Sequence, residues 1–149
     1  MKNLILMMTV LSIGFFSCDK DDDVKITDTP AAVQTSFEAE FPNATNVSSE
    51  KKGNDYEIDF RLNNVEHEAL FTAEGTLVKY KYDVLLSALP ESIKTTVSTD
   101  YEGKTIDDTE ALVIENVTYY QLELENSPQD LKLVFNADGT VNTQIPYWD

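Results

Sequence analysis

The sequence predicts an α+β fold. Two tandem units, each one helix followed by about four strands, are expected to form one antiparallel sheet of about eight strands, with both helices on one face and the other face open. Three observations predict this: an apolar stripe of helical period after each of two prolines, alternating apolar and polar residues in the segments that follow, and recurrence of this order later in the chain. The length of 149 residues and the apolar fraction of 42% are sufficient for one domain with a core.

Each unit is predicted to begin with a helix. In the first unit Thr29 is the candidate N-cap, Pro30 the first helical residue and Pro42 the stop. In the second unit Pro90 takes the place of Pro30, and the helix is expected to end near Gly103. The apolar stripes recur every four residues at Val33, Phe37 and Phe41, and at Ile93, Val97 and Tyr101. Such short helices are not stable alone, so they must pack on a sheet.

The segments after each helix have the period of half-buried strands. Apolar residues alternate with polar ones from Tyr56 to Leu62 and from Tyr120 to Leu124. Asn63-Asn64 predicts a tight turn into a strand over residues 66–72, and Glu74-Gly75 and Asp138-Gly139 predict further turns. Less regular strands are expected near residues 46–51 and 110–114.

The two units align with each other. PAAVQTSFEAEFPNA matches PESIKTTVSTDYEGK, NDYEIDF matches TYYQLEL, and LFTAEGTLV matches VFNADGTVN, so that Gly75 lies opposite Gly139. This pattern indicates an internal duplication, with repeats at residues 30–83 and 84–149.

Residues 1–17 have the features of a cleaved targeting segment. Lys2 supplies the positive start, and the uncharged stretch from Leu4 to Phe16 follows it. At about 1.5 Å per residue this stretch reaches only about 20 Å as a helix, short of a hydrocarbon core of about 30 Å. We therefore expect a signal peptide that is removed.

Cys18 is the only cysteine and directly follows this segment. Phe15, Phe16 and Ser17 resemble the last residues of a bacterial lipoprotein signal, although Leu is commoner at the position of Phe15. Lipidation of Cys18 is therefore the favoured interpretation. Burial is unfavourable beside the aspartates that follow, and a disulfide would need a cysteine from another chain. Several acyl chains on Cys18 would anchor the protein stably in a membrane.

Residues 18–29 are predicted to be the acylated cysteine and a flexible acidic linker. CDKDDD resembles the start of lipoproteins of the Bacteroidetes group, in which such acids accompany export to the outer face of the outer membrane. The alternative is that the acids only keep the linker solvated. The expected location is the outer membrane, on its periplasmic side or at the cell surface. The formal net charge of −16 argues against a nucleic-acid partner.

The chain resembles the PepSY-like lipoproteins, which are also described as similar to beta-lactamase inhibitor protein. The residues that carry the resemblance are PAAV, FPNA, YEIDF, FTAEGTLV and FNADGTVN, and it covers residues 30 to about 145 as a tandem pair. It implies a secreted or envelope-anchored binding module whose helices pack behind a concave sheet. Lactamase inhibition is not implied, because that inhibitor is held by disulfides and this chain has one cysteine.

No motif for catalysis, a cofactor or a metal is found in the sequence, so we expect a protein that is not an enzyme and binds no cofactor. His67 is the only histidine, and Glu66 and Glu68 should point to the other face of its strand, which favours a structural strand residue over a metal ligand. No GxSxG or phosphate-binding loop is present. Paired carboxylates such as Glu57 and Asp59 are expected on a solvated strand face.

The open sheet face is the candidate binding surface, and tyrosines on it would suit recognition of a protein or peptide. Its predicted residues are Glu57, Asp59, Arg61, Glu68, Leu70, Val78, Tyr80, Tyr82, Tyr119, Gln121, Glu123, Lys132 and Val134. For Val78, Tyr80 and Tyr82 the reverse parity, in which they join the core, stays open. The terminal aromatics Tyr147 and Trp148 are expected to pack or to form an adhesive tip, with packing favoured.

The leading functional hypothesis is a lipid-anchored extracytoplasmic module that binds a protein or peptide of the cell envelope. Inhibition of a peptidase or another envelope enzyme is one form of binding that this hypothesis includes. The alternative is a structural or assembly subunit of an envelope complex, joined through its sheet edge or its tail. The sequence assigns no oligomeric state.

Overall fold

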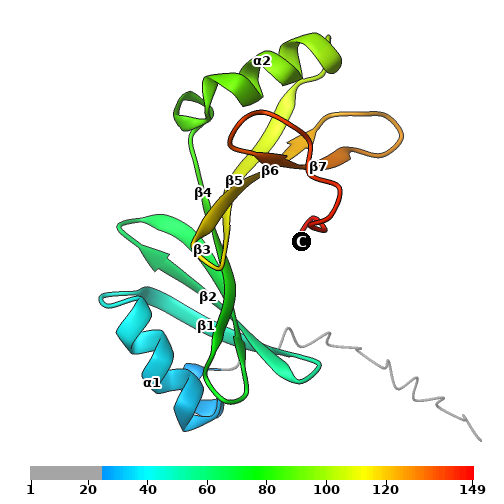
Figure 1. The fold of residues 1–149 in the computed structure, drawn as a ribbon. Coiled ribbons are helices and arrows are strands. Elements are labelled where there is room, and N and C mark those ends of the chain that lie inside the picture. The colour runs from blue at the N-terminus through cyan, green and yellow to red at the C-terminus, as the bar shows by residue number, and fades with distance from the viewer. Residues whose placement is uncertain (1–24) are drawn as a thin grey trace, which may run out of the picture.

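The protein has an α+β architecture built on one open antiparallel sheet, as the computed structural model of residues 25–149 shows (Figure 1). Seven strands lie side by side in chain order. Their bounds are β1 Thr45–Lys52, β2 Asp55–Leu62, β3 Val65–Thr72, β4 Leu77–Asp83, β5 Ile106–Ile114, β6 Val117–Leu124 and β7 Leu131–Asn136. The predicted signal peptide, Cys18 and most of the predicted linker lie outside the described residues.

Two α-helices have the predicted positions, α1 at Ala31–Glu40 and α2 at Glu91–Asp100. Each follows a short 3-10 helix, η1 at Ile26–Asp28 and η2 at Leu86–Ala88. Pro30 and Pro90 are the N-cap residues and not the first helical residues, a shift of one position from the prediction. Among residues 25–149 no helix has the length and apolar character needed to cross a bilayer.

Two tight turns set the register of the sheet. Asn63 and Asn64 join β2 to β3 with φ values of 55° and 66°, and Glu115 and Asn116 join β5 to β6 with 50° and 65°. Two successive residues at positive φ match the right-handed twist of the strands they connect, and asparagine tolerates this conformation better than most residues. The predicted turn at Asn63-Asn64 is confirmed.

Each helix packs on its own part of the sheet (Figure 1). Val33 and Phe37 of α1 belong to a cluster with Phe41 and with buried residues of β2 and β3, namely Ile58, Phe60, Ala69 and Phe71. Ile93 and Val97 of α2 belong to a second cluster with Leu89, Leu122, Leu124 and Phe135. The helical stripes and the strand alternation read from the sequence meet in these two clusters.

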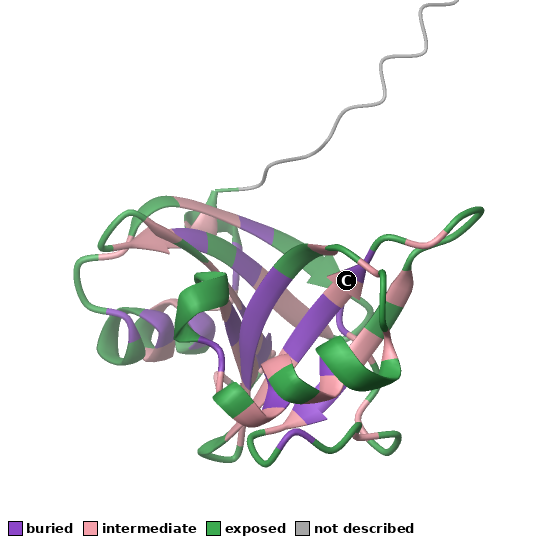
Figure 2. Ribbon diagram, turned by 90° about the horizontal axis from the view of Figure 1, so that it is seen from above, coloured by how far each residue is buried: buried purple, intermediate pink, exposed green. Residues whose placement is uncertain are grey.

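Side chains that alternate with these core residues form what we call the polar face of the sheet. The strand register aligns its central members in two rows across the sheet. One row is Asp59, Glu68, Lys81, Leu112 and Tyr119, and the other is Glu57, Leu70, Lys79, Ile114 and Val117. Gln121 and Val134 are paired on β6 and β7, next to Glu110 of β5. Buried positions gather on the strands, whereas exposed residues lie on the outer sides of the helices (Figure 2).

The predicted strand count of about eight is wrong for the regular sheet, which has seven. After the turn at Asp138-Gly139 the chain makes only an isolated bridge, Phe135 to Val141, where an eighth strand was expected. Val141 is followed by Asn142, whose side-chain oxygen accepts the backbone N–H groups of Gln144 and Ile145. This local turn diverts the chain away from the sheet edge.

The predicted orientation of the aromatic residues in β4 is also wrong. Leu77 pairs with Phe71 and Lys79 pairs with Leu70, so Val78 is an extra residue, a β-bulge, between two adjacent pairs. The bulge puts Leu77 and Tyr80 on the same side, where both pack on the α1 cluster. Tyr82 stacks with His67 on that side at a centroid distance of 5.3 Å. Lys79 and Lys81 therefore occupy the polar face in place of Tyr80 and Tyr82.

The glycine after β7 tests the packing of α2 on the sheet. Gly139 has φ +88°, and a Cβ there would lie 2.7 Å from backbone atoms of Ser92 in α2. We expect Gly139→Ala to lower the free energy of unfolding by about 2 kcal/mol or more, because strained φ and a backbone clash add together. Chemical denaturation measures this.

Gly53→Ala is the matched control. Gly53 also has positive φ, +67°, but a Cβ there meets no atom within 4 Å. Gly53→Ala should lower the free energy of unfolding by a smaller amount, about 1 kcal/mol, because only backbone strain contributes. Equal losses for the two variants would show that Gly139 does not set the distance between α2 and the turn.

Candidate functional site

The centre of the polar face is occupied by the end of the chain itself. We call Ile145 to Asp149 the Trp148 segment, and its Trp148 is only 8% exposed. The segment runs back over the sheet from the far side of β7, and the chain ends beside the inner curve of the sheet (Figure 1). The expectation that the terminal aromatics pack is confirmed for Trp148, but the contact is with the face of the sheet and not with its edge.

Gln121 of β6 holds the backbone of this segment. Its Oε1 accepts the backbone N–H of Trp148 at 2.7 Å, and its Nε2 donates to the backbone carbonyl of Trp148 at 3.0 Å. The second Nε2 hydrogen is donated to Glu110 Oε2 at 2.9 Å. Gln121 is fully buried, and these three bonds satisfy both of its donors and its acceptor. One side-chain amide thus binds the backbone N–H and C=O of a single residue, as a neighbouring antiparallel strand would.

Lys81 of β4 is the second anchor, and it is a buried cation at 7% exposure. Its ammonium lies 3.1 Å from Glu110 Oε1, 3.3 Å from Glu68 Oε2 and 3.1 Å from the Trp148 carbonyl oxygen. Three donors therefore have three acceptors, as a buried ammonium requires. Burial lowers the pKa of Lys81, but the charges of Glu68 and Glu110 outweigh burial and raise it overall. Lys81 stays charged.

Two carboxylates against one ammonium leave an excess negative charge, and Glu68 compensates for it. Burial, together with the nearby charge of Glu57 and a hydrogen bond to it, raises the pKa of Glu68 to about 8, although Lys81 opposes this. Glu68 is therefore largely protonated at neutral pH and can share its proton with Glu57. Glu68 Oε1 is buried and accepts no hydrogen bond from the described residues, which fits a protonated carboxyl group.

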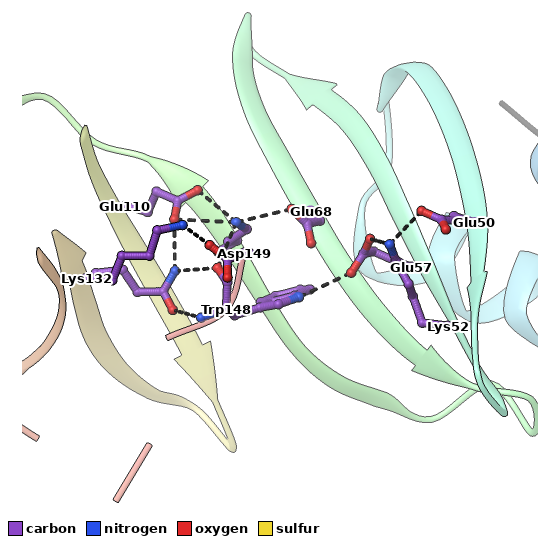
Figure 3. Close-up of polar contacts among 10 residues, drawn as sticks. Glu50, Lys52, Glu57, Glu68, Glu110, Lys132, Trp148 and Asp149 are labelled. Atoms are coloured by element: carbon purple, nitrogen blue, oxygen red, sulfur yellow. Dashed lines mark hydrogen bonds and ion pairs between the residues drawn. The ribbon is translucent and has the colours of Figure 1, made fainter. Parts of the chain in front are cut away.

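The indole of Trp148 is recognised on both its edge and its ring. Nε1–H donates to Glu57 Oε2 at 3.2 Å (Figure 3). The Lys79 ammonium lies 3.9 Å from the ring centroid, a cation–π contact. Burial lowers the pKa of Lys79, although Glu68 and Glu57 oppose this.

Two further lysines frame the site. Lys132 of β7 pairs with Asp149 and lies over the ring of Tyr147 at 5.1 Å. Lys52 of β1 pairs with Glu57 at 3.2 Å and with Glu50 at 2.6 Å. Figure 3 shows these pairs at the two ends of one line of polar contacts that crosses the sheet through Trp148. The exposed pairs contribute little stability but fix the charge pattern at the rim of the site.

Ten of the thirteen residues predicted for the open face lie on the polar face. They are Glu57, Asp59, Arg61, Glu68, Leu70, Tyr119, Gln121, Glu123, Lys132 and Val134. Tyr80 and Tyr82 lie on the opposite side, and Val78 is the bulge residue. The structure brings Glu57, Glu68 and Gln121 together around Trp148, while Asp59 and Arg61 lie nearer the rim.

Sequence reasoning missed Lys79, Lys81 and Glu110. The KYKY run shows that lysines and tyrosines take opposite sides, but not which side is which. The side is set by the bulge at Val78, which the sequence pattern does not show.

A hollow of about 330 Å³ adjoins the site at the ends of β2, β3 and β4. Its wall includes Arg61, Glu66, Lys81, Asp83 and Glu110, and Arg61 pairs with Glu66. His67 reaches this hollow, but its Nδ1 lies 3.0 Å from the Val65 carbonyl and its ring stacks between Phe60 and Tyr82. No three His, Cys, Asp or Glu residues between 25 and 149 are placed to hold a metal ion. The arrangement offers hydrogen bonds and paired charges suited to binding.

Comparison with known proteins agrees with a binding fold. The model of a family described as "Putative beta-lactamase-inhibitor-like, PepSY-like" matches residues 17–79 and again residues 62–143. No curated protein matches the chain.

Several solved structures have the same fold. A BLIP-like protein from Bacteroides fragilis is 25% identical, with a TM-score of 0.70 over 82% of this chain and 89% of that one. A DUF2874 family protein from Bacteroides uniformis is 17% identical, with a TM-score of 0.70 over 76% and 86%. A protein from Bacteroides eggerthii described as periplasmic is 15% identical, with a TM-score of 0.70 over 76% and 85%.

Glu68 should make stability depend on pH. Its pKa is about 8 in the folded protein and near 4.5 when unperturbed, so between these values the folded state holds a proton that the unfolded state releases. The stabilisation that this proton contributes to the free energy of unfolding is complete below about pH 4.5 and is lost as the pH rises through about 8. Glu68→Gln should therefore stabilise the protein relative to the parent, increasingly from pH 5 to pH 9, as measured by urea denaturation.

The groups that face Glu68 are Glu57 and Asp59 on β2, Lys79 and Lys81 on β4, and Glu110 on β5 through Lys81. Glu38→Gln on exposed α1 controls for the loss of one negative charge. A stability difference between Glu68→Gln and the parent that is constant over this pH range would contradict the assignment.

Proposed function

Because the chain belongs to the beta-lactamase-inhibitor-like, PepSY-like family, we propose that it is a non-catalytic binding module of the cell envelope. It recognises a protein or peptide through its polar face and is anchored by acyl chains on Cys18. Inhibition of a peptidase or another envelope enzyme is one form that this binding can take. The observation that carries the proposal is the site around Trp148, which binds a peptide segment by its backbone, its indole and its acidic side chain.

The charge and composition of the polar face support recognition of protein. Its centre has buried, hydrogen-bonded charges that fix orientation, and its periphery has partly exposed Leu70 and Tyr119 beside charged residues. A desolvated centre with a polar rim is the pattern of protein interfaces.

We also infer that the two halves are copies of one unit whose helices share one side of the sheet. Gly75 lies against Ala32 of α1 just as Gly139 lies against Ser92 of α2. A row formed by Phe60, His67, Tyr82, Ala111 and Tyr120 joins the two core clusters on that side. Because both helices lie on the other side, only the Trp148 segment of the described chain covers the polar face, and the rest of that face is accessible to a partner.

The anchor follows from the sequence alone. A short apolar segment ending at Ser17 and a single Cys18 match a lipoprotein signal, and an acidic linker then separates the membrane from the first helix. The location is therefore the envelope, in the outer membrane on its periplasmic side or at the cell surface.

Assembly through a sheet edge is the second candidate, but the structure favours it less. β1 forms the edge at one end of the sheet, and a register shift between Thr45 and Ser48 interrupts it. Lys51 and Lys52 are exposed on the same strand. Bulges and lysines on an edge strand oppose pairing with another strand.

A photo-crosslinking amino acid at Tyr119 tests the proposal in cells of the source bacterium. Tyr119 is partly exposed on the polar face, so we expect a discrete adduct with an envelope protein. The same amino acid at Glu91, which is 83% exposed on α2, is the matched control and should give no such adduct. Identical adducts from both positions, or none from Tyr119, would exclude recognition through the polar face.

The same cultures, fed labelled palmitate, test the anchor. The parent should incorporate the label and Cys18→Ser should not. Equal incorporation by both proteins would exclude Cys18 as the acylated residue.

A further inference from the structure

The Trp148 segment is held by contacts that a separate peptide could make. It belongs to no strand, and neither hydrophobic core cluster includes any of its residues. Its backbone is read by Gln121 and Lys81, its indole by Glu57 and Lys79, and its acidic side chain by Lys132. Each contact comes from a different position on strands β2, β4, β6 and β7, so the site is complete without residues 145–149.

The site is also selective. An indole donates a hydrogen bond to a carboxylate and offers an ammonium a larger and more favourable face than the phenol of tyrosine does. The position after it faces Lys132, which favours an acid there. The backbone contacts to Gln121 and Lys81 need only an N–H and a C=O, so the preference is set by an indole followed by an acid.

Building such a site costs free energy that the fold does not require. It buries an ammonium, two carboxyl groups and an amide that an apolar packing of the same volume would avoid. The polar groups are satisfied only when a carbonyl and an N–H occupy the place of Trp148. This is the requirement of a recognition site, and the core of the protein lies elsewhere.

We propose that the polar face contains a peptide-recognition site for an extended segment with a tryptophan followed by an acidic residue, supplied by a partner protein, and that the Trp148 segment occupies this site until the partner displaces it. This inference rests on the proposed function and names the partner's chemistry. A tethered segment competes at an effective concentration of about millimolar, so the partner must contribute contacts beyond this segment. Leu70 and Tyr119, near the site on the same face, are available for them.

Fluorescence anisotropy with a labelled peptide tests the proposal. The probe is a synthetic peptide of residues 143–149, TQIPYWD, and the protein is the whole chain with Trp148→Ala. This variant empties the place of the indole and leaves its own segment with only the backbone and Asp149 contacts, so that segment competes less well. The peptide should bind this variant at least about tenfold more tightly than the parent, whose own segment competes. A peptide with alanine in place of tryptophan should not bind.

Matched variants locate the binding. Adding Gln121→Ala to Trp148→Ala should weaken peptide binding at least about tenfold, because it removes two hydrogen bonds to the peptide backbone. Adding Gln129→Ala, a change at an exposed loop glutamine, should leave binding unchanged. Circular dichroism verifies that each variant is folded. If Trp148→Ala is not folded, Trp148→Phe keeps a ring, loses the indole N–H and should bind the peptide with intermediate affinity.

Three results would overturn the proposal: equal peptide binding by parent and Trp148→Ala, binding that ignores Gln121→Ala, or a parent dimer that Trp148→Ala dissociates. The last would assign the site to the same segment of a second copy. If the peptide does not bind as predicted but Tyr119 gives a specific adduct, the peptide site is refuted and the proposed function stays intact. Peptide binding without any Tyr119 adduct would refute the proposed function in the envelope and leave the site.

Discussion

The neutralisation of one buried cation organises the polar face. Lys81 is nearly inaccessible to water, and a buried ammonium is tolerated only when each of its donors has an acceptor. β3 supplies Glu68, β5 supplies Glu110, and the end of the chain supplies the carbonyl of Trp148. The placement of the chain end and the orientation of Gln121 follow from this requirement. The raised pKa of Glu68 instead comes from its burial and from Glu57, and Lys81 opposes it.

The need to provide acceptors for Lys81 also explains why the polar face binds backbone groups of the Trp148 segment. A third carboxylate beside Lys81 would add negative charge to a site that already holds Glu68 and Glu110, whereas a peptide carbonyl is neutral and still accepts. Gln121 of β6 binds the N–H and the C=O of Trp148 together, and Lys81 of β4 binds the same C=O, so two strands fix the backbone of one residue. Binding chemistry of this kind needs no reactive group.

Much of the fold could be predicted from periodicity and turns. Val33, Phe37 and the strand alternation around Ile58 define the first cluster, and their counterparts around Ile93 and Leu122 define the second. The bulge at Val78 could not be predicted, because one inserted residue reverses the faces of Tyr80 and Tyr82 without changing the alternation on either side. The prediction of an eighth strand was wrong for a similar local reason, because the turn formed by Asn142 diverts the chain from the sheet edge.

The candidate site was predicted in outline and missed at its centre. Gln121, Glu57 and Glu68 were assigned to the correct face by parity, but the contact between Trp148 and Gln121 joins residues 27 apart and has no periodic signal. Hydrogen exchange at the Trp148 backbone amide tests the account most directly, since this N–H donates to a fully buried side chain. The account predicts protection comparable to the amides of β6, and exchange at the rate of an unstructured peptide would contradict it.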